Sequence, residues 1–315
     1  MALRSASIRW ITVTAVTAAA AVAVATLATA CTVERYEPRF PADTSRAANE
    51  ADAATLPTPN LVRRVAFRVP LESEVADTVM LRSVRRGRAL LRNTRDSLRS
   101  YVGNRLQCVS CHALDGTQQN AMPWVGVYAR FPQYRARSGY VQIIEDRIND
   151  CFKRSMNGRA LIPESREMRD IINYFAFLSL GYPQGAEVVG QGIPPVAPLP
   201  GNEARGRAIY ASKCAVCHGV NGQGTQTAPP VWGPQSYNVG AGMTRVRTAA
   251  AFIKELMPQN APRTLSAQEA YDVATFINKK PRPDFKTKER DWPRGDPPPD
   301  VAYQTNAARA KARGR

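Results

Sequence analysis

Histidine is almost absent from this 315-residue sequence, which contains 2 of them, His112 and His218. Each closes a pentapeptide of the form Cys-x-x-Cys-His, CVSCH at 108–112 and CAVCH at 214–218. In this motif two thiols can bond to the vinyl groups of haem while the adjacent imidazole reaches the iron. A zinc site or a redox dithiol is the alternative for a single motif. Because two motifs use every histidine, we predict two covalently bound haem c groups, attached through Cys108, Cys111, Cys214 and Cys217.

The lack of a third histidine restricts the far side of each iron to Met, Cys or Lys, or leaves that position open. It also argues against a dihaem peroxidase, because no spare histidine could work at an open iron. Met257 lies 39 residues after His218 (257 − 218), in a Met-Pro turn, and the same spacing from His112 (151 − 112) leads to Cys151. We therefore predict His112 and Cys151 as iron ligands in the first half, and His218 and Met257 in the second.

The sequence also offers one alternative iron ligand in each half. Met156 competes with Cys151 in the first half, and Met243 competes with Met257 in the second. Cys151 could instead be a buried free thiol, which is common in protein cores, or form a disulfide with Cys31.

Acidic residues are also few, since 26 Asp and Glu stand against 43 Lys and Arg and give a net charge of +17. Such an excess calls for a partner of opposite sign. No nucleic-acid-binding motif is present, so we predict no nucleic-acid partner. A small anionic substrate or an anionic membrane surface fits the charge better.

The N-terminus predicts export to the periplasm. Arg4 and Arg9 precede an uncharged run over 10–30, which ends in small residues before Cys31. A basic start followed by an apolar stretch is typical of a secretory signal, and this run is also long enough to span a bilayer. Two interpretations of 1–31 stay open: a lipoprotein signal that leaves Cys31 lipidated, or an uncleaved membrane anchor.

Composition and the two motifs divide the rest of the chain into five segments. These are a tether at 32–77, a domain at 78–180 with the first haem, a Gly/Pro-rich linker at 181–200, a domain at 201–285 with the second haem, and an extended basic tail at 286–315. Strand signals are sparse, and amphipathic aromatic helices are expected near the end of each domain. The sequence therefore predicts an all-α fold of two tandem class I cytochrome c domains. The tail is expected to lie as an extended strap over the second domain and then to be disordered.

The stretch 141–158 carries the residues that predict chemistry. Apolar residues recur there every four positions and indicate a helix with a buried face. Arg147, Cys151 and Ser155 follow the same step on an adjoining face, which would bring a guanidinium, a thiol and a hydroxyl to one iron. From 130 to 159 there are seven basic residues against three acids, and Arg is suited to binding oxyanions. These seven are Arg130, Arg135, Arg137, Arg147, Lys153, Arg154 and Arg159, of which some would pair with haem propionates or face water.

The segments DRINDCFKRSMNG, YVGNRLQCVSCH, GVYARFPQYRAR, SYNVGAGMTRV and AAAFIKELMP make the chain resemble the tetrathionate-forming thiosulfate dehydrogenases, periplasmic dihaem cytochromes c, over about residues 80–285. The resemblance implies an axial Cys151 at the catalytic haem and an axial Met257 at the second. It also implies that Arg137, Arg147 and Ser155 line the substrate pocket. Some relatives carry a lysine ligand directly before the methionine, but here that position is Leu256.

The function implied is oxidation of two thiosulfate ions to tetrathionate, with electrons passed to an external c-type cytochrome. Cys151 could also leave the iron and bond to a substrate sulfur, since thiolates are strong sulfur nucleophiles. The alternatives are a membrane-tethered dihaem electron carrier without catalytic activity, in which Cys151 only sets the potential, and a different sulfur-anion redox enzyme. The direction of the reaction is not readable from the sequence.

Overall fold

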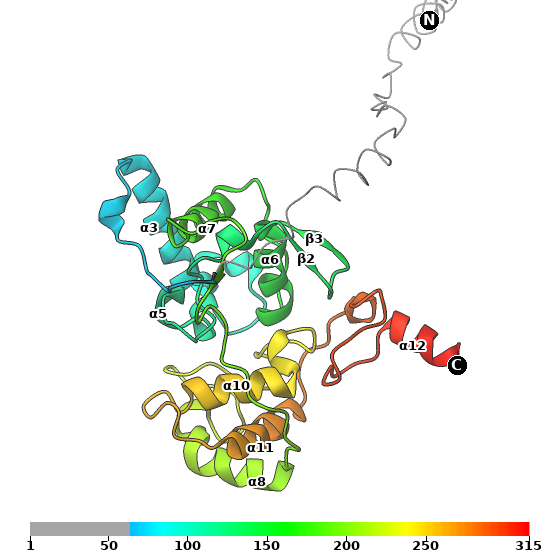
Figure 1. The fold of residues 1–315 in the computed structure, drawn as a ribbon. Coiled ribbons are helices and arrows are strands. Elements are labelled where there is room, and N and C mark those ends of the chain that lie inside the picture. The colour runs from blue at the N-terminus through cyan, green and yellow to red at the C-terminus, as the bar shows by residue number, and fades with distance from the viewer. Residues whose placement is uncertain (1–63, 315) are drawn as a thin grey trace, which may run out of the picture. The chain divides into compact units, whose positions relative to one another are not determined.

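The structure is a computed structural model, and it describes residues 64–314 (Figure 1). The predicted signal or anchor at 1–31, with Cys31, lies outside these residues, as does the predicted tether up to residue 63. Within the described part, no helix combines the length and the apolar character needed to cross a membrane.

The first domain is built around two helices that cross at a glycine, α3 (Thr78–Arg92) and α7 (Arg166–Phe177). A Cβ on Gly87 of α3 would lie 1.9 Å from the backbone oxygen of Asp170 in α7, so only glycine allows this approach. The Asp170 carboxylate accepts hydrogen bonds from Ser83 at 2.5 Å and from Arg86 at 2.8 Å. The crossing is therefore fixed by close packing and by a buried carboxylate.

The second domain repeats this arrangement with α8 (Glu203–Ile209) and α11 (Ala267–Asn278), which lie side by side in Figure 1. A Cβ on Gly206 would lie 2.0 Å from the backbone oxygen of Asp272, and the Asp272 carboxylate pairs with Arg205 at 2.6 Å. The same glycine, aspartate and arginine thus recur in both halves of the described chain.

The haem-attachment motifs lie on short helical turns that follow the first helix of each domain. In the first domain the motif at 108–112 begins in η3 (Cys108–Ser110) and ends directly before α5 (Ala113–Gly116). The turns α4 (Thr94–Ser97) and η2 (Arg99–Tyr101) precede it, and η4 (Tyr128–Arg130) follows it. In the second domain the motif lies on η6 (Tyr210–Cys214) and α9 (Ala215–His218), and η7 (Gly242–Thr244) and α10 (Val246–Leu256) come before α11.

Few residues of the described part form strands. β1 (Arg64–Val65) pairs in parallel with β4 (Glu187–Val188), and β2 (Gln133–Arg135) pairs with β3 (Tyr140–Gln142) as an antiparallel hairpin. After β3 come α6 (Ile144–Asp150) and η5 (Cys151–Ser155), which continue as one helical segment. The prediction of an all-α cytochrome c fold is confirmed, with these two short strand pairs added to it.

Each domain has its own core, and the first one borrows residues from the second half of the chain. Its buried cluster includes Tyr237 and Ala241 beside Phe152 and Met156. Hydrogen bonds hold this segment in place, because Asn238 Nδ2 donates to the backbone oxygen of Lys153 at 2.9 Å. The stretch SYNVGAGM thus lines the first domain, although it follows the second haem motif.

The C-terminal tail differs from the prediction. It contains η8 (Lys288–Arg290) and a terminal helix α12 (Asn306–Arg313), so the expectation of a disordered end is wrong for 306–313. Asp291 and Trp292 are buried, and the backbone N–H of Trp292 donates to the backbone oxygen of Arg137 at 2.8 Å. The tail therefore packs against the first domain, because its aromatic and acidic residues find partners there.

Candidate haem sites and anion pocket

The first attachment motif presents a neutral, oriented imidazole. His112 Nδ1 lies 2.5 Å from the backbone oxygen of Met122, and the ring packs against Trp124 with centroids 4.9 Å apart. The carbonyl fixes the proton on Nδ1, so Nε2 is left to bind a metal. Burial lowers the pKa of His112 to about 4, which keeps the free imidazole in its metal-binding form. Burial also raises the pKa of both Cys108 and Cys111 to about 12.

The second motif has the same design. His218 Nδ1 lies 2.8 Å from the backbone oxygen of Pro229, and burial lowers the pKa of this histidine. Burial raises the pKa of Cys214 to about 11. Trp232 takes the place of Trp124, and its ring packs against Tyr210 with centroids 4.8 Å apart. Both halves thus orient one histidine by a backbone carbonyl, and each has a tryptophan within an aromatic cluster.

Cys151 faces the first motif, with Arg147 beside it. The Arg147 Nη1 donates to Cys151 Sγ at 3.0 Å, and the negative charge of the thiolate raises the pKa of Arg147. The same thiolate adds to the effect of burial in raising the pKa of Cys108 and Cys111, and the charge of Arg147 adds to burial in lowering that of His112. These five groups therefore lie at one site.

The helix changes its hydrogen-bond pattern at Cys151. α6 is an ordinary α-helix, but η5 is a π-helix, and the Met156 N–H donates to the backbone oxygen of Cys151 at 2.9 Å. Such wider turns are rare and frequent at functional sites. Ser155 ends this turn half-buried, and within the described residues its hydroxyl makes no hydrogen bond. The step of four between Arg147 and Cys151 gives a direct contact, whereas the step from Cys151 to Ser155 runs through the wider turn.

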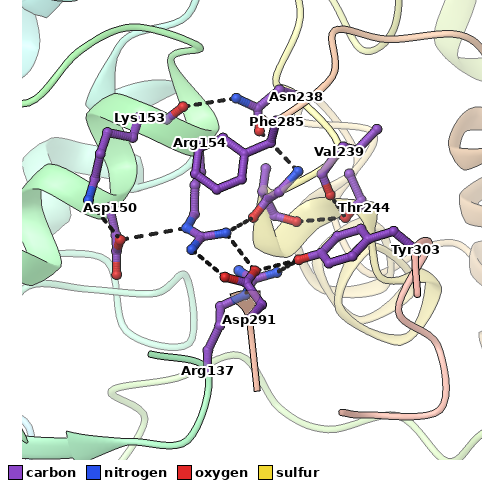
Figure 2. A network of polar contacts seen from close by, with 12 residues as sticks. Arg137, Asp150, Lys153, Arg154, Asn238, Val239, Thr244, Phe285, Asp291 and Tyr303 are labelled. Atoms are coloured by element: carbon purple, nitrogen blue, oxygen red, sulfur yellow. Dashed lines mark hydrogen bonds and ion pairs between the residues drawn. The ribbon is translucent and has the colours of Figure 1, made fainter. Parts of the chain in front are cut away.

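Arg137 does not contact Cys151 in the structure. Its Nε lies 3.1 Å from Asp291 Oδ2, and its Nη2 donates to the Tyr303 hydroxyl at 3.1 Å (Figure 2). Its guanidinium also lies 4.7 Å from the centre of the Trp292 ring. All three partners belong to the tail. The structure therefore brings Arg147 to the thiol and brings Arg137 to the C-terminal segment.

Most of the other basic residues of 130–159 have protein partners. Arg154 pairs with Asp291, Lys153 with Asp150, Arg130 with Gln191, and Arg159 with the Ser100 backbone oxygen. Arg135 is half-buried, and among residues 64–314 its only side-chain hydrogen bond goes to Gln133. Of the seven basic residues, Arg137, Lys153 and Arg154 thus have a carboxylate partner within the described chain. The other four, Arg130, Arg135, Arg147 and Arg159, have none there.

Comparison with known proteins agrees with this geometry. Residues 102–184 match the family described as SoxA/TsdA, cytochrome c domain, and residues 201–277 match Cytochrome C oxidase, cbb3-type, subunit III. A thiosulfate dehydrogenase of Allochromatium vinosum is 45% identical over 233 residues, which are 70% of this chain and 86% of that protein. A thiosulfate dehydrogenase of Psychrobacter arcticus is 39% identical over 262 residues, covering 81% of this chain and 80% of that one. The chain belongs to the thiosulfate dehydrogenase family.

A solved member of the thiosulfate dehydrogenase family has a similar fold. The structure of thiosulfate dehydrogenase TsdBA from Marichromatium purpuratum, in its as-isolated form, superposes with a TM-score of 0.67 at 33% identity. The match covers 81% of this chain but 56% of the solved chain, so this protein spans just over half of that structure. As a family member built of cytochrome c domains, the protein is an oxidoreductase that binds haem c.

The residues present fit haem c at both motifs, and two orphaned donors add to this. Within the described chain, Nε and Nη1 of Arg282 are buried without a hydrogen-bond partner, and the guanidinium lies 4.3 Å from the centre of the Tyr237 ring. Tyr237 lies near Cys111, since burial and then the charge of Cys111 raise its pKa. A buried cation without an anion is costly, and a haem propionate is an anion of the right kind. Arg282 was not predicted, because nothing in PRPDF marks one arginine as buried.

Two methionines lie near the second motif of this thiosulfate dehydrogenase homologue. Met257 ends α10 and packs against the second core together with Cys214 and Trp232. Met243 lies in η7 and contacts both cores, while its backbone oxygen accepts a hydrogen bond from Asn278 at 3.1 Å. Both methionines thus pack against the core that contains the second motif.

Proposed function

We propose that this protein oxidises two thiosulfate ions to tetrathionate in the periplasm and passes two electrons to an external c-type cytochrome. The observation that carries the proposal is the Arg147 guanidinium held 3.0 Å from Cys151 Sγ, opposite the first attachment motif. A thiolate and a permanent cation at one buried site suit a sulfur anion as substrate. The names of the relatives support this reading, since they are called thiosulfate dehydrogenases.

We assign two haem c groups to the chain. Cys108 and Cys111 would attach the first haem, with His112 and Cys151 as its iron ligands. The second haem would be attached by Cys214 and Cys217, with ligands His218 and Met257. When bound, haem c supplies one-electron acceptance at potentials set by its axial ligands. A lipidated Cys31 or an uncleaved helix would hold both domains at the membrane.

The chain's main task is then to bring two dianions together. At a separation of about 4 Å, two doubly charged anions repel each other by about 4 kcal/mol in bulk water, and by more in a buried site. Fixed guanidinium groups offset this repulsion and also raise the encounter rate. Arg147 is placed for this at the thiol, Arg137 would contribute a second cation, and the unpaired Ser155 hydroxyl can donate to a substrate oxygen.

The chemistry balances without a proton. Two thiosulfate ions lose one electron each, one sulfur–sulfur bond forms, and the product carries the remaining two negative charges. No general acid or base is required, which agrees with a chain whose two histidines are both used by the attachment motifs. Arg147 donates a hydrogen bond to Cys151 Sγ, and the thiolate is the form of cysteine that binds iron or attacks sulfur.

The test is to add thiosulfate to the oxidised holoprotein and to follow both the haem absorption bands and the tetrathionate formed. We expect prompt reduction, with one tetrathionate for every two electrons delivered to an added c-type cytochrome. A protein that exchanges electrons with cytochromes but is not reduced by thiosulfate would be an electron carrier, and the proposal would fail.

A further inference from the structure

Residues 285–305, the C-terminal segment, lie outside both regions that match family models, 102–184 and 201–277. The segment is nevertheless closely packed, because Asp291 and Trp292 are each 5% exposed and Thr305 is fully buried. Buried residues in an extended connection need a reason, since loops usually run over the surface with their polar groups in water. The partners of Asp291 suggest that reason.

The Asp291 carboxylate joins two arginines of the first domain (Figure 2). Its two oxygens accept hydrogen bonds from Nη1 and Nη2 of Arg154 at 2.7 and 2.8 Å, a bidentate pair. Oδ2 also lies 3.1 Å from Nε of Arg137, and the Tyr303 hydroxyl donates to it at 2.6 Å. One buried carboxylate thus fixes a network that spans the tail and the helical segment carrying Cys151.

Arg137 is held along one edge and from one face. The Tyr303 hydroxyl accepts a hydrogen bond from Nη2, and the Trp292 ring supports the guanidinium plane. The backbone is held as well, since Trp292 N–H donates to the Arg137 backbone oxygen. Among residues 64–314, Nη1 of Arg137 donates no hydrogen bond to protein. The contacts therefore orient the guanidinium and leave one of its donor groups for a ligand.

The charges in this network do not cancel. Arg154 meets Asp291 with both of its Nη atoms and stacks on Phe285, with its guanidinium 4.4 Å from the ring centre. The contact between Arg137 and Asp291 is an ion pair that lacks hydrogen-bond geometry. Asp150 also belongs to the network, because it lies 3.6 Å from both Lys153 and Arg154. Three cations and two carboxylates leave one positive charge, and since Lys153 pairs with Asp150 and Arg154 with Asp291, it remains on Arg137. Arg154 lies in η5, three residues after Cys151, and its charge also acts on Arg147, so this network adjoins the site at Cys151.

We propose that Asp291 is a positioning residue for substrate binding, which holds Arg137 toward the anion pocket through the clamp formed with Tyr303 and Trp292. This proposal rests on the proposed function, because it takes thiosulfate as the anion. Without the carboxylate, Arg137 and Arg154 would repel each other, and the long Arg137 side chain would gain rotamers that point away from the pocket.

The test is Asp291→Asn in the full-length holoprotein. We expect the KM for thiosulfate to rise about tenfold, the loss typical of one charge-assisted contact, while kcat stays within about twofold. Asp291→Glu keeps the charge and should recover part of the affinity, which a merely structural role would not require. The matched control is Asp300→Asn, since Asp300 lies in the same segment but accepts a hydrogen bond from the backbone N–H of Arg247. It should leave the KM unchanged.

A binding measurement separates this proposal from the function on which it rests. Sulfate is a dianion of similar shape that cannot be oxidised, and calorimetry measures its affinity without turnover. Wild-type protein should bind it, and Asp291→Asn should bind it about tenfold more weakly. If thiosulfate is not oxidised but sulfate binding still depends on Asp291, the function fails and the positioning role stands.

An unchanged or lowered KM and sulfate dissociation constant in Asp291→Asn would overturn the proposal, and so would a wild-type protein that binds no sulfate. If Asp291→Asn does not accumulate with both haems, Tyr303→Phe takes its place, because it removes one hydroxyl and keeps the carboxylate and the rings. We expect this variant to raise the KM about threefold, the loss of one neutral hydrogen bond. No rise in the KM of Tyr303→Phe would then count against the clamp.

Discussion

The two halves of the described chain share a scaffold and differ at one helical segment. The two main helices of the first domain cross at Gly87 and Asp170, and those of the second domain cross at Gly206 and Asp272. In both domains a backbone carbonyl orients the histidine. The difference lies in the sulfur groups that pack near each motif. The first half places a thiol there with a guanidinium at 3.0 Å, and the second half offers thioethers. The duplicated scaffold would hold a haem in either case, so the chemistry should depend on the segment α6–η5.

Replacing the Cys151 thiol, which distinguishes the first half from the second, should have the largest effect on activity. Cys151→Ala would remove the sulfur ligand and the anion that Arg147 contacts, so we expect kcat/KM for thiosulfate to fall by about 1,000-fold. The absorption spectrum should show one iron that has lost its thiolate ligand while the other is unaltered. A variant that keeps both haems and full turnover would remove Cys151 from the mechanism, and a persisting sulfur ligand would point to Met156.

The shared crossing can be tested with a matched pair of glycine substitutions. In Gly87→Ala and Gly206→Ala the new methyl group would meet a backbone oxygen at about 2 Å, a clash that side-chain motion cannot relieve. We expect each to lower the free energy of unfolding by about 3 kcal/mol, measured by denaturant unfolding. The haem spectrum of the altered half should be perturbed first. If one variant were neutral, the two crossings would not be equivalent, and the duplication would be looser than the structure indicates.

The arginine beside the thiol should matter for substrate and little for the fold. Arg147→Gln removes the cation at Cys151 and is expected to lower kcat/KM by about 30-fold, the effect of a lost charge-assisted hydrogen bond. Lys254→Gln is the control, since this cation precedes Met257 by three residues and makes one long hydrogen bond, at 3.4 Å. Equal losses in the two variants would mean that overall charge, rather than the site at Cys151, attracts the substrate.

The sequence predicted the parts of these sites that depend on local pattern. The attachment motifs, the equal spacing to Cys151 and Met257 and the step from Arg147 to Cys151 are short-range features. The sequence did not predict the π-helical turn at Cys151, because the same apolar spacing suits an ordinary α-helix. The roles of Asp291 and Arg282 were also missed. Each depends on contacts with residues far away in the chain, and a lone charged residue in a proline-rich tail is typical of exposed, mobile ends.

The smallest expected effect concerns the two buried carboxylates at the crossings. Burial pushes the pKa of Asp170 and Asp272 upward, but hydrogen bonds from Arg86 and Ser83 to the one, and from Arg205 to the other, outweigh it and hold both pKa values below the usual range. A group with a lowered folded-state pKa stabilises the fold above its unfolded pKa, about 4 for Asp, and loses this contribution as the pH falls through the folded value. Both domains should therefore melt at lower temperature once the pH drops below about 4.

The variants Asp170→Asn and Asp272→Asn test whether the two buried carboxylates stabilise their domains alike. Thermal unfolding of each variant is measured at pH 7 and at pH 3. Each variant should reduce the acid-induced loss of thermal stability in its own domain, measured through the absorption of that domain's haem. The other domain should keep the pH dependence of the wild type. Because each carboxylate is paired with the arginine that directly precedes the crossing glycine, the two profiles should change in the same direction. The acid response could persist in Asp170→Asn but disappear in Asp272→Asn. The pH dependence of the first domain would then come from other groups, and the two crossings would share their packing but not the contribution of the buried carboxylate to stability.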